Sequence, residues 1–385
     1  MLDRRLFLGT ASATAALGLL ARPTIALAAA ATDKRFVFII QRGAADGLAT
    51  LAPVGDPAFA ALRGAFAEDA AAGAKLDGMF ALHPALAETA RLYAAREALF
   101  VHAVASPYRD RSHFDGQNVL ETGGNAAYQL QDGWLNRLLP LLPQGEARAL
   151  AVAPTVPAVL RGPVEVSSYA PSRLPDASDD LMARVGALYD GDAQLHALWT
   201  SAIATRAQAG DMTAAGAQNG AQTGTLAAKL LTGPGSARVA VIETTGWDTH
   251  ANQRGRLAAQ LRSLDQMIAA LRSGLGPEWA NTVVLVATEF GRTAAPNGTG
   301  GTDHGTGAMA MLAGGAVAGG TVIADWPGLA PAALFQGRDL KPTLDLDGVI
   351  AGALAQHYAL DPARTLRTLF PGSASRALSR TLVPA

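Results

Sequence analysis

Short runs dominated by apolar residues recur along the chain and are separated by longer stretches of other character. Five such runs lie at residues 35–41, 99–104, 239–242, 282–287 and 308–312. A run that is apolar at nearly every position is typical of a strand buried on both faces, as in a parallel sheet covered by helices. We therefore expect these runs to form the centre of a buried sheet.

Helical stretches lie between the apolar runs. The clearest begins near Gln253, and its apolar residues, spaced three and four apart, fall on one helix face. They are Leu257, Leu261, Leu264, Ile268 and Leu271. Another helix is expected over residues 345–360. Strands that alternate with helices predict an α/β doubly wound fold with a mostly parallel sheet and right-handed crossovers.

Residues 150–235 differ in composition and pattern from the rest of the chain. Two helices are expected there, at about 180–188 and 193–207, whereas residues 210–224 are low in charge and bulk and predict a mobile loop. We interpret the segment 150–235 as an insertion that covers the sheet, not as an independent domain. The mature chain, residues 29–385, is therefore expected to be a single domain.

The N-terminus carries the features of an export signal. Arg4 and Arg5 precede the apolar residues 6–8, a stretch rich in Ala, Leu and Gly follows, and residues 26–28 fit a small-residue cleavage site. Paired arginines followed by x-Phe-Leu indicate the twin-arginine export machinery as a partner. We expect a signal peptide of residues 1–28 and a periplasmic or secreted product. The apolar stretch is too short and diluted for a membrane span, so an integral membrane protein is not expected.

Composition narrows the chemistry. Hydrophobic residues make up 49% of the chain and charged residues 16%, which excludes a disordered protein. A net charge of -1 gives no reason to expect nucleic-acid binding. The chain has no cysteine, which excludes thiolate metal sites, iron–sulfur clusters, disulfides and cysteine nucleophiles. A metal here must be held by oxygen and imidazole.

Polar and charged residues cluster directly after the predicted strands. In open α/β sheets ligands bind beyond the carboxyl ends of the strands, so we expect these residues to meet at one edge. Six of them form a mixed oxygen and nitrogen ligand set: Asp46, Asp248, His250, Glu289, Asp303 and His304. Such a set suits one or two ions of zinc or manganese, and calcium or magnesium if the carboxylates dominate. Each piece alone is also compatible with a surface loop or an ion pair.

Ser112 precedes residues 114–121, which predict a helix, and two interpretations of this serine stay open. It caps the helix, or it is a nucleophile that attacks phosphorus while a metal lowers its pKa. Arg111 and Arg292 are candidates for holding the non-bridging oxygens of an anion. His113, close to a carboxylate in sequence, is a further candidate catalytic residue.

Several motifs, after the twin-arginine leader, run in order along nearly the whole mature chain. They are Arg42-Gly43-Ala44-Ala45-Asp46-Gly47-Leu48, His83-Pro84-Ala85-Leu86, Arg111-Ser112-His113-Phe114, Gly133-Trp134-Leu135, Gly246-Trp247-Asp248-Thr249-His250, Glu289-Phe290-Gly291-Arg292 and Asp303-His304-Gly305. With them the sequence resembles DUF1501, a family of exported bacterial proteins, which is similar to a branch of the alkaline phosphatase-like superfamily. That resemblance implies an α/β/α sandwich and transfer of phosphoryl or sulfuryl groups through a Ser, Thr or modified Cys nucleophile beside one or two metals.

The resemblance also implies roles for individual residues. Asp46 matches the metal-binding aspartate after the first strand, and Ser112 matches the nucleophile. Asp248 and His250 resemble the aspartate and histidine of one metal site, and His304 resembles that site's late histidine.

The sequence departs from the superfamily pattern at two points. Glu289 stands where the superfamily has the aspartate of an Asp-His pair, but the next residue is Phe290, which cannot bind a metal. The separation of Asp248 and His250 is also shorter than the superfamily spacing. A single-metal site, to which Asp303 contributes, is therefore as well supported as a two-metal site.

These observations lead to three hypotheses. The first is an exported metal-dependent hydrolase of small anionic phosphate or sulfate esters, with Ser112 as nucleophile. The second is a non-catalytic periplasmic or cell-surface binding protein that keeps the fold. The third is a hydrolase in which metal-bound water attacks another type of bond and Ser112 is dispensable.

Overall fold

The computed structural model describes residues 33–143, 148–170, 179–209, 219–233 and 235–383. The chain divides into two units, residues 1–31 and 32–385, and the architecture below is that of the described residues of the second unit. The predicted signal peptide, residues 1–28, lies outside the described residues. None of the helices described is long and apolar enough to cross a lipid bilayer.

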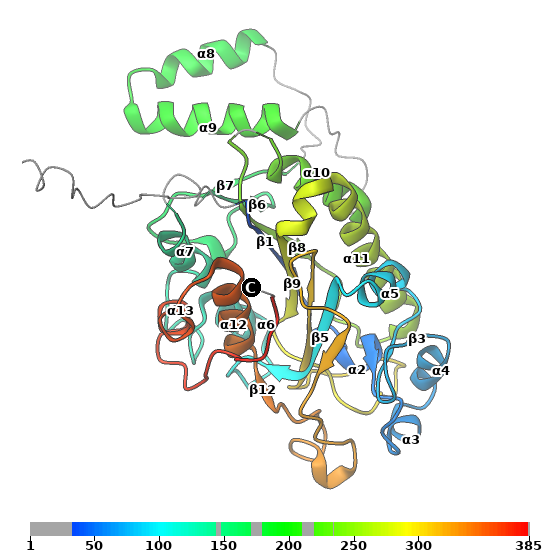
Figure 1. Ribbon diagram of the computed structural model, residues 1–385. Coiled ribbons are helices and arrows are strands. Elements are labelled where there is room, and N and C mark those ends of the chain that lie inside the picture. Colours follow the sequence, from blue (N-terminus) through cyan, green and yellow to red (C-terminus); the bar gives the residue numbers. More distant parts are fainter. Residues whose placement is uncertain (1–32, 144–147, 171–178, 210–218, 234, 384–385) are drawn as a thin grey trace, which may run out of the picture. The chain divides into compact units, whose positions relative to one another are not determined.

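A nine-stranded sheet forms the centre of the described residues (Figure 1). Its strand order is β11 (Thr321–Ile323), β5 (Ala98–Ala105), β10 (Ala308–Ala313), β9 (Thr282–Thr288), β1 (Arg35–Gln41), β8 (Val239–Thr244), β6 (Ala149–Val152) and β7 (Ser167–Ser168), and β12 (Leu344–Asp345) also pairs with β5. All five apolar runs are strands of this sheet, and the predicted α/β class with a mostly parallel sheet is confirmed.

Strand β10 is the exception to the parallel arrangement. It lies between β5 and β9 and is antiparallel to both, whereas the other pairings in the sheet are parallel. The start of β10 therefore lies at the same edge of the sheet as the ends of β5 and β9. An apolar run has the same pattern in either direction, so the sequence did not reveal this reversal.

Strand β1 shows why the central runs are apolar throughout. Phe36, Phe38 and Ile40 pack into one hydrophobic core, and Val37 and Ile39 pack into another. Because successive side chains of a strand point to opposite faces, both faces of the sheet are buried.

Helices cover these two faces (Figure 1). One face is covered by α5 (Ala87–Ala94), α10 (Gly220–Leu231) and α11 (Gln253–Leu275), and the other by α7 (Trp134–Leu138), α12 (Leu346–Tyr358) and α13 (Pro362–Leu369). This layering is the α/β/α sandwich that the family resemblance implies. The apolar stripe predicted on α11 is buried along its whole length, from Leu257 to Leu271.

The loop expected at residues 210–224 overlaps a helix at its end. Residues 210–218 lie outside the described residues, but residues 220–224 form the start of α10, so that part of the prediction is wrong. The glycines explain the helix: a Cβ on Gly220 would meet the carbonyl oxygen of Ser263 at 1.9 Å, and one on Gly224 would meet that of Met267 at 2.2 Å. Small residues here let α10 pack closely against α11.

The rest of the predicted insertion contains both sheet and helix. Strand β6 is a parallel neighbour of β8 in the central sheet, so this part is not simply a cover. Helices α8 (Asp179–Tyr189) and α9 (Ala193–Ala209) are close to the predicted bounds. The division of the chain into domains stays a prediction.

A small substructure follows β1. It contains α2 (Gly47–Thr50), α3 (Phe59–Arg63), α4 (Phe66–Ala71) and a three-stranded sheet of β2 (Leu51–Ala52), β4 (Ala81–Leu82) and β3 (Ala74–Lys75).

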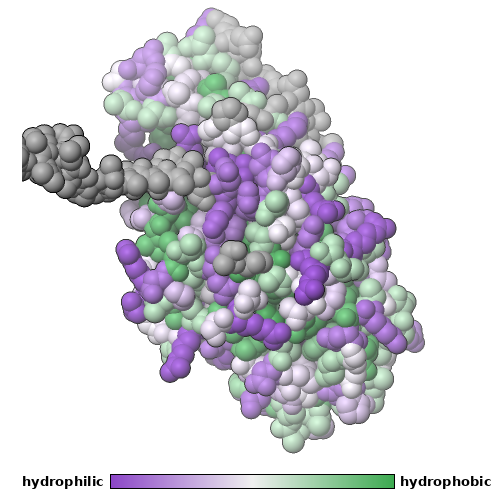
Figure 2. All heavy atoms as spheres, in the orientation of Figure 1, coloured by the Kyte–Doolittle hydropathy of each residue, from purple (hydrophilic) through white to green (hydrophobic). Residues whose placement is uncertain are grey.

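On the face drawn in Figure 2, hydrophilic and apolar residues are interspersed over the surface.

One buried carboxyl makes stability depend on pH. Asp347, in the first turn of α12, is 5% exposed and accepts a hydrogen bond from Ser373 Oγ at 3.0 Å. Burial raises the pKa of Asp347 from 3.8 to about 7, although the bond from Ser373 opposes the rise. The folded state therefore holds this proton more tightly than the unfolded chain does. The free energy of unfolding must fall as the pH rises from 3.8 towards 7.

We expect Asp347→Asn to raise the free energy of unfolding at about pH 8 by on the order of 2 kcal/mol, because the cost of ionising a buried carboxyl disappears. The gain should shrink near pH 4, where the carboxyl is protonated in the folded state. Urea denaturation at both pH values measures it, with the exposed Asp325→Asn as the control. An equal effect of Asp347→Asn at both pH values would contradict the assigned pKa.

Candidate metal centre

Five segments that the sequence singled out meet at one edge of the sheet. Strands β1, β5, β8 and β9 all end there, and β10 begins there because it runs the opposite way. The residues that follow or precede these strand ends, at 42–47, 106–115, 245–250, 289–293 and 303–307, therefore come together. The predicted convergence at a strand-end edge is seen in the structure.

Three of these residues form a group suited to a metal ion. His113, Asp248 and His304 each offer one ligand atom, and these atoms lie within 4.8 Å of one another. His113 is the first residue of α6 (His113–Thr122), Asp248 follows β8, and His304 precedes β10. Residues far apart in sequence thus share one small space.

His250 extends this group. Its Nε2 lies 3.0 Å from Asp248 Oδ1 and 2.9 Å from His304 Nε2. Two imidazole lone pairs at that distance repel each other unless a proton or a cation lies between them. We name His113, Asp248, His250 and His304 the imidazole group.

The other ring nitrogen of each histidine bonds to an oxygen acceptor. His250 Nδ1 lies 3.1 Å from Asp303 Oδ1, and His304 Nδ1 lies 2.9 Å from the carbonyl oxygen of Arg111. A carbonyl oxygen only accepts, so His304 Nδ1 carries the proton and its Nε2 keeps a free lone pair. This arrangement is typical of metal-binding histidines, whose second nitrogen is held by a carboxylate or a carbonyl.

His113 shows the same arrangement most clearly. Its Nδ1 lies 2.8 Å from Glu289 Oε1, and its buried Nε2 makes no hydrogen bond among the described residues, although Asp248 Oδ2 lies 3.4 Å away. A buried polar nitrogen without a partner costs free energy, and a bound cation would satisfy it. The hydrogen bond to Glu289 raises the pKa of His113, whereas burial chiefly lowers that of His304.

Glu289 contacts His113 Nδ1 and is not one of the imidazole group, and its role as a metal ligand stays a prediction. Its carboxylate also accepts hydrogen bonds from Gly43 N at 2.8 Å, Thr288 Oγ1 at 2.8 Å and Gln117 Nε2 at 3.2 Å. Burial opposes ionisation of Glu289, but hydrogen bonds, first that from His113 and then those from Gln117 and Thr288, outweigh it and lower its pKa. Glu289 therefore orients His113, and Asp303, also predicted as a ligand, orients His250.

Arg292 holds Asp248 in place. Its buried guanidinium donates to Asp248 Oδ1 at 2.7 Å and to Thr302 Oγ1 at 3.2 Å. Burial would raise the pKa of Asp248, but the bond and charge of Arg292 lower it overall, so the carboxylate stays ionised. Arg292 is thus bound to a ligand residue, and its predicted role in holding a substrate anion has no support in these contacts.

Arg111 is likewise occupied elsewhere. Its guanidinium forms a double contact with Asp339 Oδ2, at 2.7 and 2.9 Å, and donates to Gln336 Oε1 at 2.6 Å. Its contribution to the centre is the backbone carbonyl that orients His304. The predicted use of the Arg111 side chain as an anion clamp is therefore not supported by the geometry.

Asp46 is not part of the imidazole group. It is 1% exposed, and its carboxylate contacts Arg63 NH2 at 2.6 Å, Gln253 Nε2 at 2.6 Å and the backbone amide of Ala49 at 3.0 Å. Burial raises and the Arg63 charge lowers the pKa of Asp46, with a net lowering. These contacts give Asp46 a structural role, and its assignment as a metal ligand stays a prediction.

A chain of hydrogen bonds links Asp46 to the centre. Gln253 donates to Asp46 and accepts from Thr302 Oγ1 at 2.6 Å, and Thr302 Oγ1 in turn accepts from Arg292. Arg292 then holds Asp248. Sequence reasoning did not identify Arg63, Gln253 or Thr302, because a single polar residue in a helix or loop gives no signal of such a distant partner.

Ser112 and Phe290 complete the surroundings. Ser112 occupies the N-cap position of α6, but its side chain makes no capping hydrogen bond, so the capping interpretation loses its main support. The Phe290 ring stacks on His113 with a centroid distance of 5.1 Å, and it is buried. The residue that departs from the superfamily pattern thus forms an apolar wall beside the imidazoles.

Comparison with known proteins places these observations in a family. A family model described as "Protein of unknown function (DUF1501)" matches residues 33–370. No curated protein matches the chain. Among solved structures, the chain is similar to the C-terminal periplasmic domain of EcEptC from Escherichia coli in complex with Zn, with 8% identity, a TM-score of 0.37 and coverage of 72% of each chain.

Two further structures are similar at the same low level. One is Ps i-CgsB in complex with k-i-k-neocarrahexaose, with 11% identity, a TM-score of 0.43, and coverage of 87% of this chain and 74% of that chain. The other is the phosphonate monoester hydrolase of Agrobacterium radiobacter, with 10% identity, a TM-score of 0.32, and coverage of 76% and 70%. Similarities this low assign neither an activity nor a residue role.

We expect Asp248→Asn to lose stoichiometric metal and Asp46→Asn to keep it, because only Asp248 lies in the imidazole group. The two variants are matched, since each removes the charge partner of a buried arginine. Both should lower the free energy of unfolding, Asp46→Asn by about 3 kcal/mol. Elemental analysis of protein purified without chelators, with urea denaturation, measures both effects. A folded Asp46→Asn protein that lacks metal would restore Asp46 as a ligand.

Proposed function

The chain belongs to the DUF1501 family, and we propose that it is an exported metal-dependent hydrolase of phosphate or sulfate esters. The observation that carries this proposal is the imidazole group. Three histidines and Asp248 converge there, and each histidine is oriented by an acceptor on its Nδ1. Such preorientation has a clear use only if the Nε2 atoms bind something together.

The donor set supports a divalent cation. Three imidazoles with one carboxylate suit zinc or manganese better than calcium or magnesium, which prefer oxygen ligands. The Nε2 of His113, which is buried without a hydrogen bond, also favours a bound cation. The four residues His113, Asp248, His250 and His304 supply enough ligands for one ion. A bound cation would polarise an ester oxygen and lower the pKa of a nearby hydroxyl.

Ser112 is the proposed nucleophile. It immediately precedes His113, its side chain is partly exposed, and it does not cap α6. In the first displacement, Ser112 Oγ forms a bond to phosphorus or sulfur while the bond to the alcohol breaks, and the departing oxygen takes up a proton in place of the one the serine loses. In the second, water replaces Ser112 Oγ and restores the hydroxyl.

The N-terminus of α6 is the proposed positive partner for the substrate anion. The first amides of a helix have no acceptor within the helix, and they carry the positive end of its dipole. Ser112 lies at this end. Arg111 and Arg292 are bound to Asp339 and Asp248. We therefore assign the role of holding the substrate anion to the N-terminus of α6.

We expect Ser112→Ala to reduce ester hydrolysis by about a thousandfold or more and to leave metal content and stability unchanged. A panel of phosphate monoesters, phosphate diesters and sulfate esters, assayed on the metal-loaded mature protein, measures this loss. Ser167→Ala, at the far edge of the sheet, is the control for removing a hydroxyl. Full activity of Ser112→Ala would point to water as the nucleophile. Metal binding without turnover of any ester would favour a binding protein.

We also expect the double variant Arg4→Lys and Arg5→Lys to remain in the cytoplasm, because the twin-arginine machinery reads the paired guanidinium groups. Cell fractionation followed by N-terminal sequencing of the mature protein measures this, and the wild-type product should begin after residue 28. Unchanged export of the double variant would contradict the proposed pathway without affecting the proposed chemistry.

A further inference from the structure

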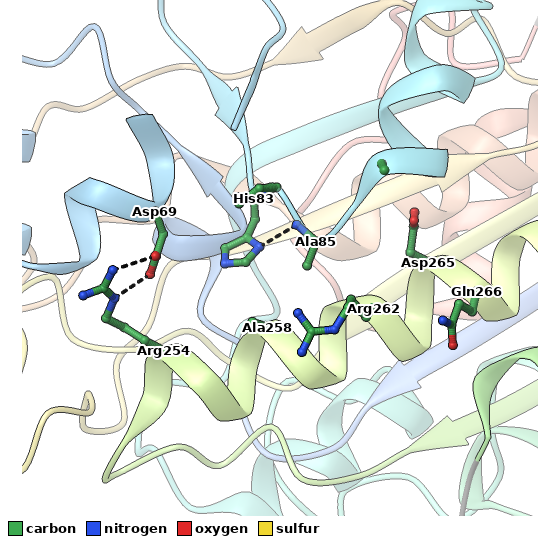
Figure 3. A pocket seen from close by; sticks show the side chains of 10 residues that line it. Asp69, His83, Ala85, Arg254, Ala258, Arg262, Asp265 and Gln266 are labelled. Carbon is green, nitrogen blue, oxygen red and sulfur yellow. Dashed lines mark hydrogen bonds and ion pairs between the residues drawn. The ribbon is translucent and has the colours of Figure 1, made fainter. Parts of the chain in front are cut away.

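A cavity of about 420 Å³ lies along the outer side of α11 and shares no lining residue with the imidazole group. Figure 3 shows it between this helix and the segment that follows β4. That segment is the His83-Pro84-Ala85-Leu86 motif, which has no role in the proposed hydrolysis. Its volume lies within the range of pockets that bind small molecules, roughly 300–1,000 Å³.

His83 presents a hydrogen-bond donor to this cavity. Its Nδ1 accepts a hydrogen bond from the backbone amide of Ala85 at 3.1 Å, so the proton of the neutral ring sits on Nε2. The residue is 6% exposed, and burial lowers its pKa, which keeps the ring neutral. In Figure 3 the ring stands over α11, with Asp69 on one side and Arg262 on the other.

The acidic residues of the cavity are already bound. The Asp69 carboxylate accepts two hydrogen bonds from the Arg254 guanidinium, both at 2.8 Å. Asp265 accepts from the backbone amides of Glu88 and Thr89, at 2.9 and 2.8 Å, at the start of α5. The oxygens of both carboxylates are therefore held by other donors.

Arg262 is the charge that remains. Its guanidinium has no hydrogen bond or ion pair with any of the described residues, and it is near enough to His83 to lower the pKa of that ring. Pro84, Ala85 and Ala258 give the cavity an apolar lining beside this positive group. A cation and a neutral N–H donor beside a small apolar surface match an anionic group on a compact carbon skeleton.

We propose that this cavity binds a small organic anion, with its carboxylate or phosphate group held by Arg262 and His83 Nε2. We call it the α11 anion site. A planar guanidinium matches either oxyanion with two parallel hydrogen bonds, and His83 supplies a third. The inference does not rest on the proposed hydrolysis, since the two sites share no residue.

The test follows the imidazole resonances of His83 by NMR while the mature protein is titrated with inorganic phosphate and, separately, with acetate. His83→Gln identifies the resonances. Because they report locally, phosphate that binds at the imidazole group does not count as a positive result. We expect saturable shifts in the millimolar range for at least one of the two anions, and the stronger of the two identifies the oxyanion.

The variant Arg262→Gln should weaken this binding by about tenfold or more, equivalent to about 1.4 kcal/mol. Arg272→Gln is the matched control, because this arginine lies on the same helix, is also exposed, and pairs with Glu97 outside the cavity. The control should bind like the wild type. Equal weakening by both variants would mean that anions respond only to the overall surface charge, and would overturn the proposal. The absence of a saturable His83 shift with both anions would also overturn it.

Discussion

The contact between the buried guanidinium of Arg292 and the Asp248 carboxylate is the interaction on which the centre depends. Arg292 follows β9, Asp248 follows β8, and Arg292 also forms a backbone bridge with His304, just before β10. One residue thus joins three of the segments that supply the imidazole group. An arginine cannot lose its proton in a protein, so this position requires a permanently ionised carboxylate nearby. The Asp248 carboxylate is also the anionic member of the imidazole group. The contact that satisfies the buried arginine therefore also fixes this group.

A second layer of contacts explains why the imidazoles face one another. Glu289, Asp303 and the carbonyl of Arg111 each hold one histidine by Nδ1, and Phe290 packs against His113. Fixed rings lose little further freedom when they bind a ligand together, which favours a site formed in advance. The hydrogen-bond chain through Gln253 and Thr302 extends this order to the buried pair of Asp46 and Arg63. The α11 anion site lies on the other side of the helix that begins with Gln253.

The sequence predicted the general location of the chemistry better than the role of each residue. Apolar runs identified the strands, and the rule for parallel sheets placed His250 and His304 at one edge. It could not distinguish a ligand from a residue that supports a ligand. Asp46 and Glu289 look like ligands in sequence, but their oxygens are taken by Arg63 and by His113, and such partners are decided by packing over long sequence separations. The helix start at Gly220 was missed for a similar reason, because close contact with α11 outweighs the low helix propensity of glycine.

The position of β10 has a consequence for biosynthesis. This strand lies in the interior of the sheet, between β5 and β9, yet it is encoded late in the chain. While the ribosome is still making the residues before β10, the gap between β5 and β9 stays open and His304 is absent from the centre. Co-translational folding therefore cannot finish the imidazole group, which is assembled only as synthesis nears its end.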